Sequence, residues 1–207
     1  MKRILLIVFS LMFGLSAHAA SDIYKPDVRD GDIIFHYSRS EQSQALKEAI
    51  GSPYTHMGII FIRDGKPHVF EAAKTVRLTG LKTWIKQGEN DHYVIKRLKE
   101  ADKYLTQDGL RKLHAVAKTF NRKVYDSQFS WSDEKMYCSE LVWKVYERAL
   151  GLRIGNLEKM RDFNLGSLIV REAAQKRFGT NVPLDETVVS PVSMFNSPLL
   201  ETVASNP

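Results

Sequence analysis

The single cysteine of the chain, Cys138, is the first candidate for chemistry. It begins a segment in which apolar residues recur at steps of three and four, the helical period, and Gly151 follows as a C-cap would. Cys138 is therefore expected in the first turn of a helix. Free backbone N–H groups and the positive end of the helix dipole lie there, and both stabilise a thiolate. The alternative interpretation is a small, inert core cysteine.

A base for this thiol is predicted in a hairpin earlier in the chain. Two apolar-rich segments flank Asp64-Gly65, a dipeptide typical of a two-residue type I′ turn. In that register Gly58 lies opposite Glu71, and His56 and Glu71 are diagonal neighbours on one face. A carboxylate beside an imidazole orients the ring and stabilises its protonated form, as a general base requires. A shift of one residue would place the two on opposite faces.

Other catalytic chemistries find less support in the sequence. His36, His56, His68 and Cys138 are possible zinc ligands, but the chain has neither an HExxH motif nor paired cysteines. The hairpin register also places His68 on the face opposite His56. Serine catalysis of the G-x-S-x-G type lacks its motif. We therefore predict no metal site and no cofactor.

The N-terminal residues predict export. Lys2 and Arg3 precede an apolar run over residues 4–15, and residues 17–19 have the small-x-small sequence at which signal peptidase cuts. We expect a signal peptide at residues 1–19 and a mature chain located in the periplasm or cell envelope. The apolar run is shorter than the roughly 20 residues of a membrane span, so we expect no stable span after cleavage. The alternative is an uncleaved anchor.

Charge and cysteine content narrow the possible partners. Without residues 1–19 the chain has 28 Lys and Arg against 24 Asp and Glu, a mild excess without a dense basic block. We therefore predict no nucleic-acid binding. A lone cysteine in an oxidising compartment has no internal disulfide partner, so it is either inert or kept for its reactivity.

Residues 20–207 are expected to form a single α+β domain, because they can fill one core and no repeat or linker divides them. Besides the hairpin, periodicity and turn residues predict strands at residues 30–37, 92–98 and 187–191 and helices at 38–51, 107–121, 138–150 and 165–178. Residues 38–41 have the spacing of a capping box. Residues 77–84 are expected to be irregular, and the end from residue 197 weakly structured and mobile.

Several motifs together resemble one known family. They are Gly31-Asp32-Ile33-Ile34-Phe35, Tyr54-Thr55-His56-Met57-Gly58, Val69-Phe70-Glu71-Ala72, Tyr125-Asp126-x-x-Phe129-Ser130-Trp131, Tyr137-Cys138-Ser139-Glu140-Leu141-Val142-Trp143 and residues 186–191. The chain is similar to the YiiX/YebB-like group of circularly permuted, papain-like NlpC/P60 proteins. This resemblance implies a permuted papain-like α+β fold, with an antiparallel sheet packed against the nucleophile helix and the base-bearing strands placed before it in the chain.

The resemblance also implies roles for individual residues. Cys138 corresponds to the nucleophile, His56 to the general base and Glu71 to the polar third member. The motifs further contain Asp32, Tyr54, Tyr125 and Tyr137, which we expect to bind substrate.

The family implies a cysteine hydrolase that forms an acyl-thioester. For an exported chain, the first candidate substrate is an amide bond of a peptidoglycan peptide, cut by an amidase or endopeptidase. Because the permuted branch related to lecithin:retinol acyltransferase handles lipid acyl groups, a lipid acyl hydrolase or acyltransferase is the alternative. A third possibility is a non-catalytic protein that binds a lipid or peptide at the same site.

Overall fold

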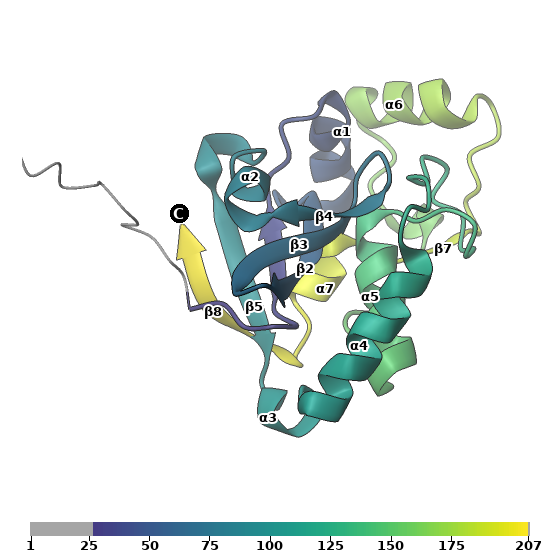
Figure 1. Cartoon of the computed structure of the whole chain (residues 1–207). Coiled ribbons are helices and arrows are strands. Elements are labelled where there is room, and N and C mark those ends of the chain that lie inside the picture. The colour runs from purple at the N-terminus through teal and green to yellow at the C-terminus, as the bar shows by residue number, and fades with distance from the viewer. Residues whose placement is uncertain (1–26, 207) are drawn as a thin grey trace, which may run out of the picture.

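The computed structural model describes residues 27–206, so the predicted signal peptide at residues 1–19 lies outside the described part. Its centre is a six-stranded antiparallel sheet with the order β4-β3-β2-β1-β5-β8 (Figure 1). These strands are β1 (Ile33–His36), β2 (His56–Arg63), β3 (Lys66–Ala72), β4 (Val76–Gly80), β5 (Tyr93–Leu98) and β8 (Leu200–Asn206). A separate short ladder pairs β6 (Glu158–Lys159) with β7 (Thr187–Val188).

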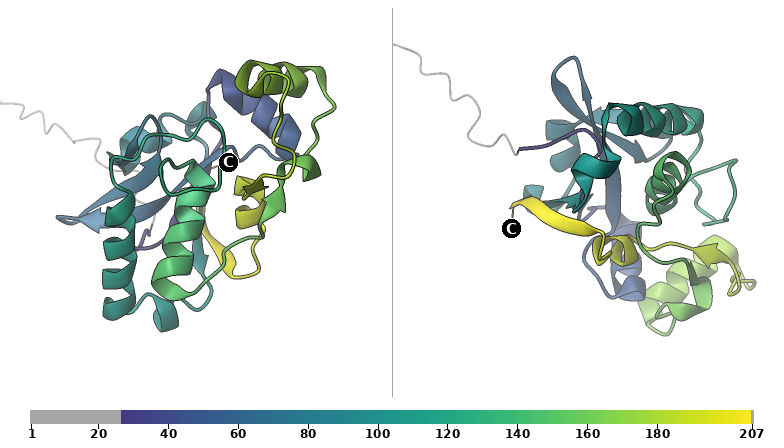
Figure 2. Two further views of the ribbon diagram at one scale, coloured as in Figure 1. Left: turned by 90° about the vertical axis from the view of Figure 1, so that its right-hand side faces the viewer. Right: turned by 90° about the horizontal axis from the view of Figure 1, so that it is seen from below.

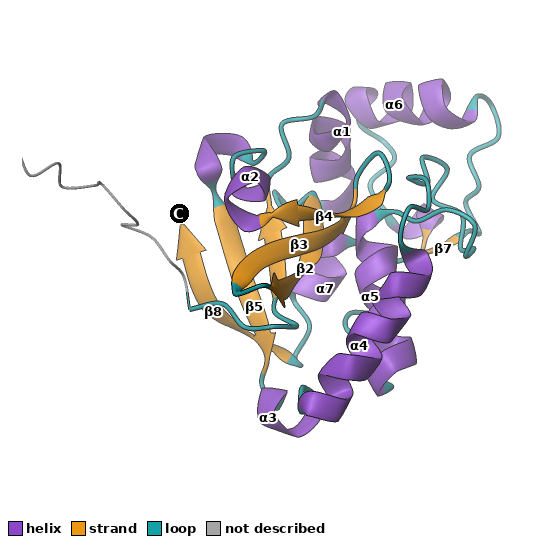
Figure 3. Cartoon of the chain, in the orientation of Figure 1, coloured by secondary structure: helices purple, strands orange, loops and turns teal. Residues whose placement is uncertain are grey.

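Helices cover both faces of the sheet (Figure 3). They are α1 (Glu41–Ile50), α2 (Leu81–Ile85), α3 (Ala101–Tyr104), α4 (Gln107–Phe120), α5 (Cys138–Leu150), α6 (Leu168–Phe178) and α7 (Pro191–Phe195), with 3-10 turns η1 (Glu89–Asp91) and η2 (Met160–Asp162). Helices α4 and α5 pack side by side against one face (Figure 2), and α2 packs on the other. Helix α6 lies against α1, at one end of the molecule. No helix within residues 27–206 is long and apolar enough to cross a membrane.

The two faces of the sheet bury separate cores, because successive side chains of a strand point to opposite sides. Ile33 and Phe35 of β1 face the larger core, which includes Leu141 of α5. Ile34 faces the smaller core, which includes Trp84 of α2. Each fully buried side chain of this kind contributes about 1.5–3 kcal/mol. The larger core anchors α5 to the sheet and so holds Cys138 in place.

The predicted hairpin and nucleophile helix are confirmed. Strands β2 and β3 pair with Arg63 opposite Lys66, and the turn residues Asp64 and Gly65 have φ of 51° and 69°, as a type I′ turn requires. Helix α5 begins at Cys138 and ends at Leu150, and its C-cap is Gly151, whose φ of 69° is left-handed.

The start of the first helix differs from the prediction. Its N-cap is Ser40, so the capping box over residues 38–41 is wrong. The Ser38 N–H instead donates to the Thr55 hydroxyl oxygen at 2.9 Å, which ties this segment to the chain just before β2. A tertiary hydrogen bond therefore replaces the local one.

Two further predictions are wrong. Residues 77–84 are not irregular, because they form most of β4 and α2. The end of the chain is not weakly structured, because residues 200–206 form β8 along β5. Residues 187–191 contain only the two-residue β7, after which Pro191 begins α7.

Candidate active site

The start of α5 is held by its neighbours, which positions Cys138. The Glu140 carboxylate accepts a hydrogen bond from the Tyr137 N–H at 3.4 Å. The Ser139 hydroxyl donates to the Val189 carbonyl at 2.7 Å, and the Tyr137 hydroxyl oxygen accepts from the Val189 N–H at 3.1 Å. Cys138 itself is 4% exposed. The nucleophile candidate thus sits on a fixed helix end rather than on a loop.

His56 lies between Cys138 and Glu71. Its Nε2 is 2.7 Å from a Glu71 carboxylate oxygen, and its ring is within hydrogen-bonding reach of the Cys138 thiol. Since Nε2 meets the carboxylate, Nδ1 is left for the sulfur. The predicted register that makes His56 and Glu71 neighbours is confirmed by the pairing of β2 with β3. Gly58 allows the close approach of these strands, because a β-carbon there would lie 2.5 Å from the Val69 side chain.

Glu71 is fully buried and accepts three further hydrogen bonds. The Thr79 hydroxyl of β4 donates at 2.6 Å, and the Trp84 indole N–H of α2 donates at 2.9 Å. The half-exposed Arg77 of β4 donates its Nε–H at 3.5 Å and forms an ion pair. Four donors therefore fix the carboxylate that orients His56. The sequence motifs did not point to Arg77, Thr79 or Trp84. The one signal for this strand is the alternation of apolar and polar residues over residues 76–79.

Electrostatics at this site favour a charged pair. Burial lowers the pKa of His56, but hydrogen bonds that the ring donates to Cys138 and Glu71 outweigh it and raise that pKa to about 10. Burial raises the pKa of Glu71, but the hydrogen bond to His56 and its charge outweigh it and lower that pKa to about 2. At neutral pH His56 is therefore an imidazolium beside the Cys138 sulfur.

His36 adds a neutral second imidazole next to His56. Its ring stacks on Trp84 at 4.0 Å and lies 5.2 Å from the His56 ring. Burial, followed by the charge of His56, lowers the pKa of His36 to about 2. His36 therefore packs against the base without placing a second positive charge there.

Cys138 opens onto a cavity of about 590 Å³ between α1, α6 and the segment after β7. The side chains that line its far part are mainly aliphatic and aromatic. They include Ala45, Leu46, Ile50, Phe163, Ile169 and Val170. At the nucleophile end the cavity is lined by Tyr125, Phe129 and Tyr137. Its size and apolar walls are those of a pocket for a small organic group.

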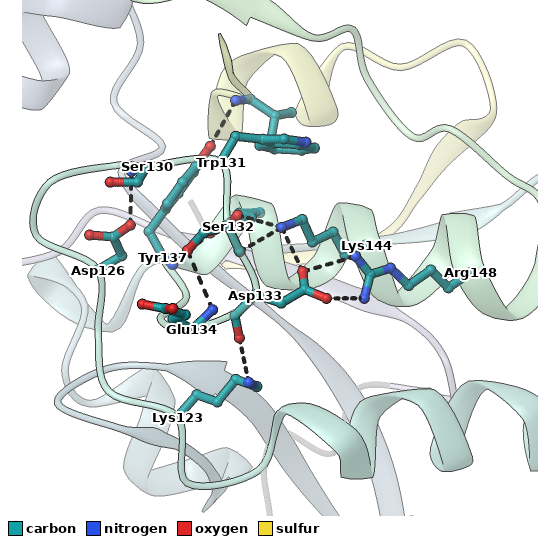
Figure 4. Close-up of polar contacts among 12 residues, drawn as sticks. Lys123, Asp126, Ser130, Trp131, Ser132, Asp133, Glu134, Tyr137, Lys144 and Arg148 are labelled. Carbon is teal, nitrogen blue, oxygen red and sulfur yellow. Dashed lines mark hydrogen bonds and ion pairs between the residues drawn. The ribbon is translucent and has the colours of Figure 1, made fainter. Parts of the chain in front are cut away.

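The loop that carries Tyr125 and Phe129 is tied to α5 by an ion-pair network (Figure 4). Asp133 pairs with Lys144 at 3.0 Å and with Arg148 at 2.7 Å. Lys144 is 4% exposed and also donates to a Glu140 carboxylate oxygen at 2.8 Å. Burial of Glu140 raises its pKa to about 7, although Lys144 opposes the shift. The network therefore joins the loop to the first turn of the nucleophile helix.

Comparison with known proteins identifies the family. The permuted papain-like amidase family YaeF/YiiX (C92) matches residues 27–204. The chain belongs to this family. It is 45% identical over 199 residues to the uncharacterised protein YiiX of Escherichia coli K12, covering 96% of this chain and 94% of the relative. A crystal structure described as the metalloprotein yiiX of Escherichia coli O157:H7 matches with a TM-score of 0.83 and 45% identity, covering 88% of this chain and 99% of that one.

Family membership confirms the permuted papain-like fold and the resemblance drawn from the motifs. It also makes the chain an amidase-type hydrolase by family. Within that framework, the structure brings Cys138, His56 and Glu71 together.

Of the four residues predicted to bind substrate, Tyr125 and Tyr137 line the cavity with Cys138. Burial raises the pKa of both hydroxyls, so both keep their protons at neutral pH. Tyr54 is not part of this lining, because its ring stacks on Phe195 at 4.0 Å. Burial, with Tyr37 nearby, raises the pKa of Tyr54 to about 12.

Asp32 is not brought to the site. It precedes β1, at the end of that strand remote from His36, and is fully buried. Its carboxylate receives hydrogen bonds from Arg97 at 2.7 and 2.8 Å and from the Arg29 N–H at 2.7 Å. These contacts give Asp32 a role in joining β1 to β5. His68, the possible ligand on the opposite face, has its Nδ1 3.0 Å from the Lys66 carbonyl oxygen.

Proposed function

We propose that this protein is a cysteine amidase that works through an acyl-thioester. The connected series of Cys138, His56 and Glu71, set at the start of α5 and open to a cavity, is the observation that supports it. A nucleophile, a base and a group that orients the base are the three parts that acyl transfer requires.

The charged pair sets the order of the proposed steps. The Cys138 thiolate attacks the amide carbonyl carbon, forming a C–S bond and moving the carbonyl electron pair onto oxygen. The imidazolium of His56 then gives its proton to the leaving nitrogen as the C–N bond breaks. Neutral His56 next takes a proton from water, which attacks the thioester carbon, and the thiolate leaves. Glu71 stays ionised throughout and holds the ring.

Two donors are proposed for the oxyanion. The backbone N–H of Cys138 is in the first turn of α5, where no intrahelical acceptor exists. The second is the Tyr125 hydroxyl, because Tyr125 shares the cavity with Cys138 and keeps its proton. Tyr125 is also bridged to Met136, two residues before Cys138, which places it beside the approach to α5.

For the substrate, the predicted export to the cell envelope supports a peptidoglycan peptide. The mainly aliphatic far part of the cavity supports a second candidate, an amide or ester of a lipid acyl group. In both cases the acyl carbon must reach Cys138 at one end of the cavity. The two candidates differ in what fills the space between α1 and α6.

The relative described as a metalloprotein raises the question of a metal here. Within residues 27–206, no three His, Cys, Asp or Glu side chains form a group that could hold a metal ion. At the candidate site the Nε2 of His56 faces Glu71, which leaves only the Cys138 sulfur and Nδ1 as adjacent donors. This donor set does not fit a three- or four-ligand centre, so no step of the proposed mechanism runs through a metal.

The test is hydrolysis of a γ-D-glutamyl peptide and a medium-chain acyl amide by the wild type and by Cys138→Ala. We expect product release and a covalent acyl adduct, detected by intact-mass spectrometry, for the wild type only. The variant should keep the wild-type circular dichroism spectrum. Equal turnover by Cys138→Ala would refute the mechanism. Absence of turnover with either substrate and an unreactive thiol would favour the binding-protein alternative.

A further inference from the structure

Helix α6 runs along the cavity and is attached at both ends. Near its start, the Ser167 hydroxyl donates to the Glu48 carboxylate of α1 at 2.5 Å. Near its end, the Gln128 side chain donates to the Arg177 carbonyl oxygen at 3.3 Å. Gln128 follows Tyr125 closely in the chain, so the last turn of α6 lies at the nucleophile end of the cavity. This turn brings two cations to the cavity wall, the exposed Lys176 and the partly buried Arg177.

Arg177 lines the cavity together with the exposed Glu172 of the same helix, but forms no ion pair within residues 27–206. It lies 4.5 Å above the centre of the Phe129 ring. No ion pair joins it to a carboxylate in the described part of the chain; the acidic neighbour that acts on it, Asp126, accepts instead from the backbone N–H groups of Gln128 and Ser130, each at 2.8 Å. Burial lowers the pKa of Arg177, but a guanidinium stays protonated in proteins at neutral pH. A partly buried cation has lost part of its hydration, and without a counter-ion nothing offsets that free-energy cost. A bound anion would offset it.

Phe129, whose ring lies beneath Arg177, has a strained backbone conformation. Phe129 has a φ of 55°, in the left-handed region that a bulky residue rarely adopts. The two backbone hydrogen bonds to Asp126 enclose it, and its ring meets that of Tyr137 edge-on at 5.2 Å. The loop therefore fixes an aromatic platform beside Cys138, and the guanidinium on it is positioned rather than free to turn outward.

The helix dipole alone does not explain the position of Arg177. A cation in the last turn of a helix is favoured by the helix dipole. Lys176, exposed in the same turn, meets that need without losing its hydration. The dipole therefore explains a positive charge in the last turn of α6 but not a guanidinium seated on Phe129 at the cavity wall.

We propose that Arg177 recognises a carboxylate on the substrate close to the scissile amide. This rests on the proposed function, since it assigns a specificity residue to the same site. Two substrate sources share this chemistry. In an N-acyl amino acid the carboxylate is on the leaving amine, and in a γ-glutamyl peptide it is the α-carboxylate of the acyl residue. The aliphatic part of the cavity suits the acyl chain of the first.

The experiment measures binding to the full mature chain carrying Cys138→Ala, so that it does not depend on turnover. The probes are N-decanoylglycine and its neutral analogue N-decanoylglycinamide, and a γ-D-glutamyl peptide with its α-carboxylate free or amidated. We expect one carboxylate to bind roughly 10- to 100-fold more tightly than its amide, as one charge-assisted hydrogen-bonded pair would give. The pair that shows this preference identifies the source.

Arg177→Gln should remove the preference while leaving binding of the neutral analogue unchanged. Arg171→Gln is the matched control, because Arg171 is exposed on the same helix and does not line the cavity; it should retain the preference. An equal preference in Arg177→Gln, or no preference for either carboxylate, would overturn the assignment. A preference that depends on Arg177 in a protein that turns over neither substrate would uphold this inference and refute the proposed catalysis.

Discussion

Replacing Glu71 by glutamine keeps the size of the side chain and removes its charge. In the wild type, four donors point at the carboxylate. They are His56 at 2.7 Å, Thr79 at 2.6 Å, Trp84 at 2.9 Å and the half-exposed Arg77 at 3.5 Å. The amide has one acceptor oxygen and a nitrogen that is itself a donor, so at least one buried donor loses its acceptor. Together with the lost ion pair, we expect about 3 kcal/mol less unfolding free energy near pH 7.

The pH dependence follows from the direction of the two pKa shifts. The pKa of Glu71 falls from 4.5 to about 2, so its contribution to stability is present above pH 4.5 and is lost as pH falls towards 2. The pKa of His56 rises from 6.5 to about 10, so its contribution is present below pH 6.5 and is lost as pH rises towards 10. In Glu71→Gln, the loss of stability between pH 4.5 and 2 that is due to Glu71 should disappear. The loss of stability above pH 6.5 that is due to His56 should become smaller.

The assay combines denaturant unfolding with an NMR titration of the His56 ring. A loss of about 3 kcal/mol corresponds to a melting temperature roughly 6–12 °C lower for a chain of this size. The His56 pKa should move down towards 6.5, and alkylation of Cys138 by iodoacetamide at neutral pH should slow because less imidazolium supports the thiolate.

Glu89→Gln is the matched control, because Glu89 is exposed in η1 and, among the residues that the structure describes, makes only backbone hydrogen bonds. It should leave the His56 titration and the unfolding free energy unchanged. An unshifted His56 pKa in Glu71→Gln would refute the reasoning, since the ring would then owe its charge to another group.

Two further substitutions test how the site is held. Gly58→Ala would place a β-carbon 2.5 Å from Val69 and 2.7 Å from the Phe70 carbonyl oxygen. We therefore expect the free energy of unfolding, measured in urea, to fall by about 1–3 kcal/mol. Gly80→Ala is the control and should change that free energy little, because no atom lies within 4 Å of a β-carbon there. Asp133→Asn removes the anion shared by two basic residues of α5. Because Asp133 is half-exposed, we expect the free energy of unfolding to fall by at most about 1 kcal/mol, but amide hydrogen exchange over residues 126–136 to become faster. Unchanged exchange there would count against the anchoring role.

The features that the sequence predicted correctly depend on short-range physics. The Asp64-Gly65 turn sets the hairpin register through the backbone conformation of two residues, and this alone places His56 beside Glu71. The start of α5 at Cys138 follows from apolar periodicity and a C-terminal glycine. Both signals act within about a dozen residues, so no knowledge of distant partners was needed.

What the tertiary structure decided depends on partners far apart in the chain. Strand β8 forms because it pairs with β5, about a hundred residues earlier, and its own residues carry no comparable signal. Asp32 is not at the site because its carboxylate pairs with Arg97, 65 residues later in the chain. The donors that fix Glu71 come from a short strand and a one-turn helix, whose local preferences are weak. Arg177 reaches the cavity because α6 packs on α1 and on the loop after Tyr125. Each of these contacts arises only on folding, when non-local burial and pairing outweigh local propensity.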